Sequence, residues 1–158
     1  MKVISTNIAD IQTIKFRGQN VKTGIFKYAT AEGIFLGKED VGKDNVVDRK
    51  YHGGEDKACY LYATNHYEYW QKLHPDLKFD LGMFGENLSI ENLDESKIYI
   101  GDIYQLGEAK VQISQPREPC FKLGARFGTQ KVVHQFLKAD FPGIYIRVLQ
   151  EGKVKCWR

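Results

Sequence analysis

The residue best suited to act as a nucleophile or metal ligand in the sequence is Cys120, in the segment SQPREPCFKLGARFG. Pro119 precedes it and fixes its own backbone φ, which favours a rigid corner. Arg117 and Lys122 flank the cysteine, and positive neighbours favour the thiolate, which is the nucleophile and the soft metal ligand. The same cations could hold a phosphate group. A plain structural role stays open, since a lone cysteine is often a small buried apolar residue.

A second polar motif, YHGGEDKA, places two glycines directly after a histidine. Because Gly53 and Gly54 carry no side chain, the backbone can approach a ligand closely and point its amide groups toward it. His52 could then hydrogen-bond a phosphate or a reacting group. The alternative is an ordinary loop with an exposed histidine, because Gly-Gly is a common turn signal.

Two further segments carry polar residues beside glycines. In DLGMFGENLSIENL, Glu86 offers a hydrogen-bond acceptor and Asn87 an amide. In VKTGIFK, Lys22 and Thr23 precede a glycine and could hold a phosphate. Both segments also suit structural roles, the first as a turn before a strand and the second as the polar edge of a sheet.

The bulk composition is that of an ordinary globular protein, with 158 residues of which 42% are hydrophobic and 27% charged. This length suits one domain that spans residues 1–158. A net charge of +3 is too small to argue for nucleic acid and suits a small anionic ligand equally well. No apolar run is long enough for a membrane span, and the N-terminus lacks the apolar core of a signal peptide. A cytoplasmic location is therefore expected.

The three cysteines are widely spaced and form no C-x-x-C pair. This spacing argues against a zinc ribbon or a disulfide framework. Cys59 and Cys156 lie in strand-like runs and are predicted to be packing residues.

Short strands dominate the predicted secondary structure. Strands are indicated by β-branched and aromatic residues in four segments, NVKTGIFKY, ACYLYA, KIYIGDIYQLGEAKVQIS and IYIRVLQEGKVKCW. The last two segments each predict a strand pair, with turns at LGEA and at EG. In the last segment, Ile144, Ile146 and Val148 are expected to share one face.

Two helices are predicted, one from Thr64 to the proline at position 75 and one from Thr129. Many short strands with few helices predict a mainly β fold, in the form of a bent-sheet β-barrel with a few short helices.

Four segments in this order, DRKYHGGEDKA, GMFGENL, IGDIYQLGEAKVQISQPREPCFKL and YIRVLQEGKV, together resemble the MOSC domain family. The name refers to the C-terminal domain of molybdenum cofactor sulfurase. The sequence is most similar to the stand-alone bacterial type linked to detoxification of N-hydroxylated purines, over residues 22–154. Larger relatives continue beyond the last segment, whereas this chain ends at KCWR.

The resemblance implies a β-barrel with short helices and a site centred on one cysteine, which ligates molybdenum or carries sulfur as a persulfide. The matching residue here is Cys120. The resemblance further implies that basic residues and loop amides hold the pterin and phosphate of the cofactor, at Lys22, Thr23, His52, Gly53, Gly54, Asn87 and Arg117.

The leading hypothesis is a molybdenum-cofactor-dependent oxidoreductase that reduces N-hydroxylated substrates such as hydroxylaminopurines. His52, Asp48 or Glu118 would move protons during N–O cleavage. Electrons would come from a separate flavin or iron–sulfur protein, since no G-x-G-x-x-G or P-loop motif occurs in the sequence.

Two alternatives stay open, a sulfur carrier with a persulfide on Cys120 and a non-catalytic cofactor carrier. No membrane partner is expected. Nucleic-acid binding is disfavoured, because the aromatic residues mostly lie at core-like spacing.

Overall fold

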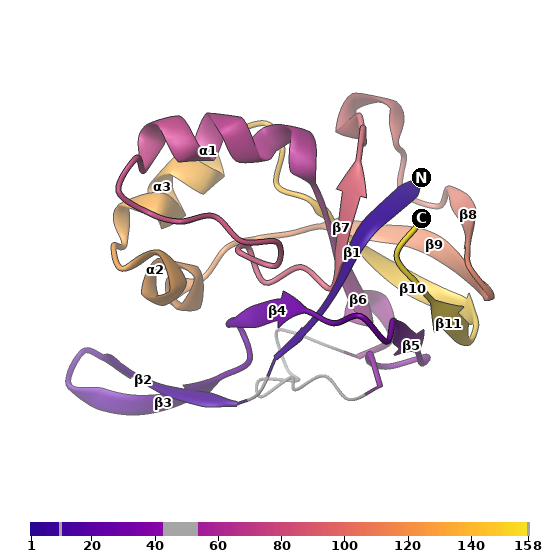
Figure 1. Cartoon of the computed structure of the whole chain (residues 1–158), viewed down its shortest axis with the longest axis horizontal. Helices are drawn as coiled ribbons and strands as arrows, with labels where there is room; N and C mark the ends of the chain where they lie inside the picture. Colours follow the sequence, from indigo (N-terminus) through magenta and orange to yellow (C-terminus); the bar gives the residue numbers. More distant parts are fainter. Residues whose placement is uncertain (10, 43–53, 158) are drawn as a thin grey trace.

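A computed structural model describes residues 1–9, 11–42 and 54–157 of the chain (Figure 1). Its main feature is a seven-stranded sheet with the strand order β4-β1-β7-β6-β10-β9-β8. Only the β6–β7 pair is parallel among these described strands; every other neighbouring pair is antiparallel. The strands are β1 (Lys2–Ala9), β4 (Lys27–Ala29), β6 (Cys59–Ala63), β7 (Leu88–Glu91), β8 (Ile103–Leu106), β9 (Ala109–Pro116) and β10 (Ile144–Gln150).

The central strands are buried on both faces. In β6, Cys59 and Leu61 belong to one apolar cluster, and Tyr60 and Tyr62 belong to a second cluster on the opposite face. The alternation follows from the period of two along a strand. The predicted face of β10 is confirmed, because Ile144, Ile146 and Val148 all lie in the first cluster. Tyr145 lies in the second cluster.

Three α-helices in the described residues gather on one side of the sheet, as Figure 1 shows. They cover the face that carries the second cluster, to which Trp70 of α1, Leu123 of α2 and Phe136 of α3 contribute. The helices are α1 (Tyr67–Leu73), α2 (Phe121–Phe127) and α3 (Lys131–Lys138). Three 3₁₀ turns accompany them, η1 (Glu55–Lys57), η2 (Thr64–His66) and η3 (Glu95–Lys97). None of the described helices has the length and apolar character that a membrane crossing requires.

The predicted helix from Thr64 begins later than expected. Thr64 and the next two residues form η2, and its hydroxyl donates to the Ile90 carbonyl at 3.3 Å instead of capping α1. The predicted helix from Thr129 is confirmed in substance as α3, which buries Val132 and Phe136. The helix α2 between them was not predicted.

The prediction of a closed β-barrel is wrong. Within the described residues, the outermost strands β4 and β8 pair on one side only, so the sheet is open. These two strands have three and four residues, and no ladder joins them. The mainly β character with short helices is confirmed.

A small second sheet bridges one end of the large sheet. It pairs β5 (Ile34–Leu36) with β11 (Gly152–Val154). The Glu108 amide in the β8–β9 turn donates to the Lys153 carbonyl at 3.0 Å, and the Trp157 amide donates to the β1 residue Val3 at 2.7 Å. The predicted β10–β11 hairpin is therefore wrong, because β11 takes β5 as its partner. A separate hairpin joins β2 (Gln12–Phe16) and β3 (Gln19–Thr23).

Candidate functional site

Cys120 lies where the β9 strand gives way to helix α2. Its backbone is extended, with φ −127° and ψ 177°, and it occupies the N-cap position of α2. The side chain is half-buried. Of the other two cysteines, Cys59 is buried as predicted, whereas Cys156 is exposed, so its predicted packing role is wrong. Cys120 is the thiol that combines access with cationic neighbours.

Arg117, three residues earlier, is buried with 5% of its surface exposed. Its guanidinium carbon lies 4.7 Å from the ring centroid of Tyr60 and 5.4 Å from that of Phe136. One terminal nitrogen, Nη1, donates to the carbonyl of Phe84 at 2.5 Å. The Nε atom is buried and has no hydrogen-bond partner. Within the described residues no carboxylate forms an ion pair with this guanidinium.

Arg117, Tyr60, Tyr145 and Cys120 form a cluster in which the charged form of Arg117 is favoured. Burial lowers the pKa of Arg117, but the nearby Tyr60, Tyr145 and Cys120 raise it by more, so the net direction is upward. Burial raises the pKa of Tyr60 well above its usual range, so its phenol is neutral and donates to the Pro142 carbonyl at 2.6 Å. Burial also raises the pKa of Tyr145, while Arg117 lowers it and Cys120 raises it.

A cavity of about 260 Å³ opens beside this cluster. It is lined by Lys57, Gln115, Pro116, Glu118 and Tyr145. The Lys57 ammonium lies 5.7 Å from the centroid of the Tyr145 ring. Polar side chains from η1, β9 and β10 therefore converge on one space next to the segment that carries Cys120.

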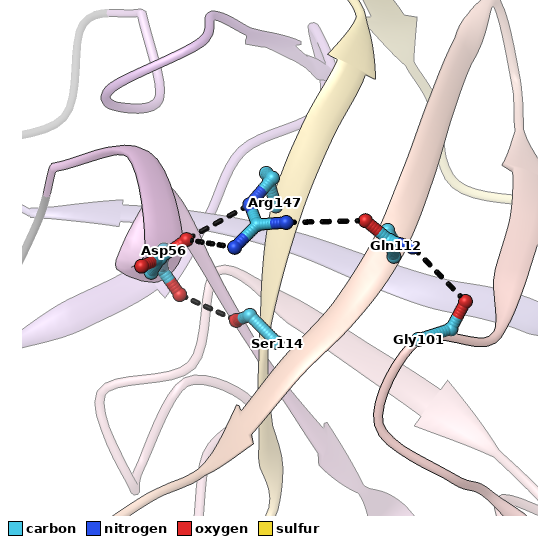
Figure 2. A network of polar contacts seen from close by, with 5 residues as sticks. All are labelled: Asp56, Gly101, Gln112, Ser114 and Arg147. Atoms are coloured by element: carbon cyan, nitrogen blue, oxygen red, sulfur yellow. Dashed lines mark hydrogen bonds and ion pairs between the residues drawn. The ribbon is translucent and has the colours of Figure 1, made fainter.

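A polar network, drawn in Figure 2, fixes the η1 turn over β9 and β10. The guanidinium of Arg147 donates to Asp56 Oδ1 through Nε at 2.8 Å and through Nη2 at 2.5 Å. Ser114 donates to the Asp56 carbonyl. Arg147 Nη1 also donates to Gln112 Oε1 at 3.2 Å, and Gln112 Nε2 donates to the Gly101 carbonyl at 3.1 Å. The network links three elements that border the cavity, so it positions the η1 end of the cavity wall.

The glycine-rich motif before η1 is described only from Gly54 onward; the predicted site residues Asp48, His52 and Gly53 lie outside the described residues. Gly54 has φ +82°, and a Cβ atom there would meet no atom within 4 Å. Glycine is needed for this backbone conformation rather than for space. The Gly54 amide donates to the Glu39 carbonyl at 3.0 Å.

The loop before β7 is organised around Glu86, a side chain with no exposed surface. Burial raises the pKa of Glu86, and its hydrogen bonds partly counter that effect. The carboxylate accepts from Tyr67 Oη, from the Gly82 amide at 3.1 Å, from the Phe84 amide at 3.0 Å and from Ser89 Oγ at 3.0 Å. The same loop presents the Phe84 carbonyl to the buried guanidinium.

Asn87, a predicted cofactor-binding residue, is buried with 5% of its surface exposed. Its Oδ1 accepts from the Tyr60 amide at 3.1 Å, and its Nδ2 donates to the Asn7 carbonyl at 3.4 Å. The side chain thus connects β6 with β1. Its role toward a cofactor stays a prediction.

Lys22 and Thr23, also predicted to bind cofactor, end the β3 strand. Lys22 is exposed, whereas Thr23 is fully buried and its hydroxyl accepts from the Ile25 amide at 3.1 Å. The β2–β3 hairpin reaches the edge of the site, because the rings of Phe16 and Phe121 stack with centroids 4.1 Å apart. Phe121 directly follows Cys120.

Sequence reasoning missed the two tyrosines of the cluster and Lys57. Tyr60 and Tyr145 lie in strands 85 residues apart in sequence and are brought opposite each other by the β6–β10 register. Lys57 lies in the histidine–glycine motif YHGGEDKA, but the sequence does not indicate that its side chain lines the cavity with Tyr145. A local motif cannot reveal such long-range pairing.

Comparison with known proteins identifies the family to which the sequence is similar. The MOSC domain family model matches residues 48–156. YflK of Bacillus subtilis is 38% identical over 152 residues, which are 96% of this chain and 68% of YflK. A protein of Gibberella moniliformis named reductase is 37% identical over 141 residues, 87% of this chain but only 25% of that protein. The crystal structure of YiiM from Geobacillus stearothermophilus aligns with a TM-score of 0.78 and 32% identity, over 98% of this chain and 70% of YiiM.

Proposed function

Because the chain belongs to the MOSC domain family, we propose that it binds a molybdenum cofactor and reduces N-hydroxylated small molecules. The similar protein named reductase supports the reaction type, although this chain spans a quarter of that protein's length. The observation that carries the proposal is the buried, incompletely satisfied Arg117 three residues before the accessible thiol of Cys120.

The buried guanidinium fits an anionic ligand. Its Nε lacks a partner, its Nη1 donates to a neutral carbonyl, and its guanidinium packs against two aromatic rings. A buried charge without a counter-charge is costly, and arginine is suited to planar recognition of phosphate. The phosphate of the cofactor would supply both the missing acceptor and the missing negative charge.

The thiol of Cys120 fits a soft metal. A thiolate suits metals that prefer sulfur, and the described residues contain no group of three or more His, Cys, Asp or Glu side chains that could hold a metal ion. We propose Cys120 as the protein's ligand to the metal that the cofactor would bring.

When bound, the cofactor would supply the two-electron redox chemistry, while the protein supplies binding, orientation and electrostatics. In the overall reaction, a hydroxylamine takes up two electrons and two protons and yields an amine and water. The electrons would come from a separate flavin or iron–sulfur protein. We assign proton delivery to His52 and Asp48, with Lys22, Thr23, Gly53, Gly54 and Asn87 as further contacts to the cofactor.

Molybdenum content tests the proposal. Wild type, Cys120→Ala and Cys156→Ala are produced in a host that makes the cofactor, and bound metal is measured by elemental mass spectrometry. We expect about one metal per chain in the wild type and in Cys156→Ala, the matched control at an exposed thiol. We expect loss of metal in Cys120→Ala. Loaded wild type with an artificial electron donor should reduce benzamidoxime; metal binding without this turnover would leave a cofactor carrier.

A sulfur carrier is the second candidate, and the free, half-buried thiol of Cys120 favours it. A persulfide on Cys120 needs cationic surroundings and access but no metal. Absence of metal from all three folded proteins, together with cyanide-releasable sulfur that depends on Cys120, would move the assignment to this function.

A further inference from the structure

The β2–β3 hairpin extends away from the seven-stranded sheet, at the lower left of Figure 1. Among the described residues no ladder joins it to another strand, so its two strands pair only with each other. The stack of Phe16 on Phe121, with ring centroids 4.1 Å apart, ties it to the start of α2. Because Phe121 directly follows Cys120, the hairpin lies beside the segment that carries the thiol.

The two faces of the hairpin differ in character. Directly paired residues of antiparallel strands share a face, and successive residues alternate between faces. One face is polar and exposed throughout, and it consists of Thr13, Lys15, Asn20 and Lys22. The opposite face is partly buried and carries the apolar residues Ile14, Phe16 and Val21. The apolar face therefore turns toward α2, and the polar face, here called the outer face, is left to solvent.

The outer face and the tip of the hairpin are cationic. Arg17 in the turn between the strands is exposed, like Lys15 and Lys22 on the outer face. Residues 11–28 contain four Lys or Arg residues and no Asp or Glu. The other residues of the chain are 19 basic and 20 acidic, so the positive excess of the whole protein comes from this segment.

The charges of Lys15 and Arg17 are not neutralised by a neighbouring carboxylate in the part of the chain that the structure describes. Lysines of β1, α1 and η3 each form an ion pair with an acidic side chain. The ion pairs of the described residues include neither Lys15 nor Arg17. An exposed surface of one sign attracts a partner of the opposite sign and speeds its encounter.

The chemistry of the outer face favours an acidic protein over a nucleic acid. Single strands are bound by stacking their bases on aromatic rings, whereas Phe16 of the hairpin is stacked inward on Phe121. A duplex is held through many phosphate contacts at once. The hairpin offers three exposed cations on two strands of five residues each, which suits a few carboxylates on a protein surface.

We propose that the outer face of the hairpin, with Arg17 at its tip, docks the acidic surface of the separate protein that delivers electrons. This inference rests on the proposed function, which requires such a donor, and it adds where the donor binds and what its surface carries. The donor would lose the two electrons that the hydroxylamine takes up. Lys22, which we assign to the cofactor, lies on the same face as Lys15, so a docked donor would lie next to the group that it reduces.

Binding of donor-like proteins tests the proposal without any turnover. The probes are an acidic flavodoxin and an acidic [2Fe–2S] ferredoxin, and dissociation constants are measured by isothermal titration calorimetry at low salt. Wild type is compared with the double variant Lys15→Gln/Arg17→Gln. The matched control is Lys110→Gln/Lys153→Gln, which removes two exposed charges near the β8–β9 turn.

Wild type should bind at least one of the two probes. The hairpin variant should bind that probe about tenfold more weakly, and the control variant should stay within about twofold of wild type. The difference should shrink in about 0.5 M salt, since mobile ions screen exposed charges. In samples loaded with cofactor, benzamidoxime reduction driven by flavodoxin should fall in the hairpin variant, whereas reduction driven by the small donor methyl viologen should not.

The inference would be overturned if folded wild type bound neither probe at low salt, or if the control variant lost as much affinity as the hairpin variant. Tighter binding of a single-stranded oligonucleotide than of either protein, with the same loss in the hairpin variant, would assign the face to nucleic acid instead. Circular dichroism establishes that each variant is folded. Probe binding through the hairpin without metal or turnover would count against the proposed reaction alone. Turnover with methyl viologen but no probe binding would count against this inference alone.

Discussion

Replacing Glu95 by glutamine should stabilise the protein at pH 8 but not at pH 4. Glu95 begins η3, is largely buried, and its Oε1 accepts from the Gly143 amide at 2.8 Å, while its Oε2 is buried without a partner. Burial raises the pKa of Glu95 to about 7 from an ordinary value of 4.5. Glutamine keeps an acceptor for Gly143 and has no charge to bury.

The sign and size of the effect follow from proton linkage. Between pH 4.5 and 7 the folded protein holds the Glu95 proton more strongly than the unfolded chain does. The contribution of the Glu95 proton to the free energy of unfolding is therefore fully present below pH 4.5 and is lost as the pH rises through 7. Since each pKa unit is worth about 1.4 kcal/mol, the full cost is about 3 kcal/mol. Partial exposure of the carboxylate reduces this to about 1 to 2 kcal/mol.

Urea unfolding at pH 4 and pH 8 measures the effect. The wild type should lose about 1 to 2 kcal/mol relative to Glu95→Gln between these two pH values. Glu68→Gln, which removes an exposed carboxylate on α1, is the matched control and should follow the wild type closely. An equal difference between wild type and Glu95→Gln at both pH values would refute the burial of a titrating carboxylate.

Two further predictions concern the scaffold of the site. In urea unfolding, Gly143→Ala should destabilise the protein by about 3 kcal/mol or more, and Gly54→Ala by about 1 kcal/mol. Both glycines have positive φ, but only a Cβ at Gly143 would meet a backbone atom, the Leu61 oxygen at 2.7 Å. Equal losses in the two variants would contradict the steric reason. Tyr62→Phe should cost about 1 to 2 kcal/mol and alter tryptophan fluorescence, because it removes the acceptor of the buried Trp70 Nε1–H, 2.7 Å away. An unchanged free energy of unfolding would show that this indole needs no partner.

The strands that sequence predicted well are those whose pairing is local or whose faces are unambiguous. The β8–β9 hairpin was predicted because Gly107, with φ +56°, supplies the turn. The EG turn after β10 gave the same signal, yet β11 pairs with β5, more than a hundred residues earlier in the chain. Turn chemistry identifies a change of direction, and it cannot identify which strand is then nearest.

Helix α2 was missed because its sequence opposes the structure. The segment contains Gly124, and glycine within a helix is unfavourable by about 1 kcal/mol relative to alanine. The tertiary reason is close packing: a Cβ on Gly124 would lie 2.4 Å from the side chain of Gln130, whose Nε2 donates to the Phe121 carbonyl at 3.0 Å. The glycine makes room for a contact that only the folded chain contains.

The sequence predicted that Cys120 and Arg117 belong to the candidate site, but it did not predict that Arg117 is buried. Cys120 and Arg117 are close in sequence, so their proximity was visible. Arginine is usually exposed, and nothing local indicated that Arg117 would lie against the rings of Tyr60 and Phe136. These rings come from β6 and α3, so the burial depends on the whole arrangement of sheet and helices.

The way Arg117 is held explains how it can keep its charge for a ligand. Its backbone amide donates to the Gly143 carbonyl at 3.2 Å, and its Nη1 donates to the Phe84 carbonyl at 2.5 Å, both neutral acceptors. Two carboxylates act one step away, since Glu95 accepts from the Gly143 amide and Glu86 from the Phe84 amide. These acids fix the two segments that position the arginine without forming an ion pair with it. A direct ion pair would neutralise the guanidinium and remove its attraction for an anion. The arrangement therefore suits an arginine whose counter-charge arrives with the ligand.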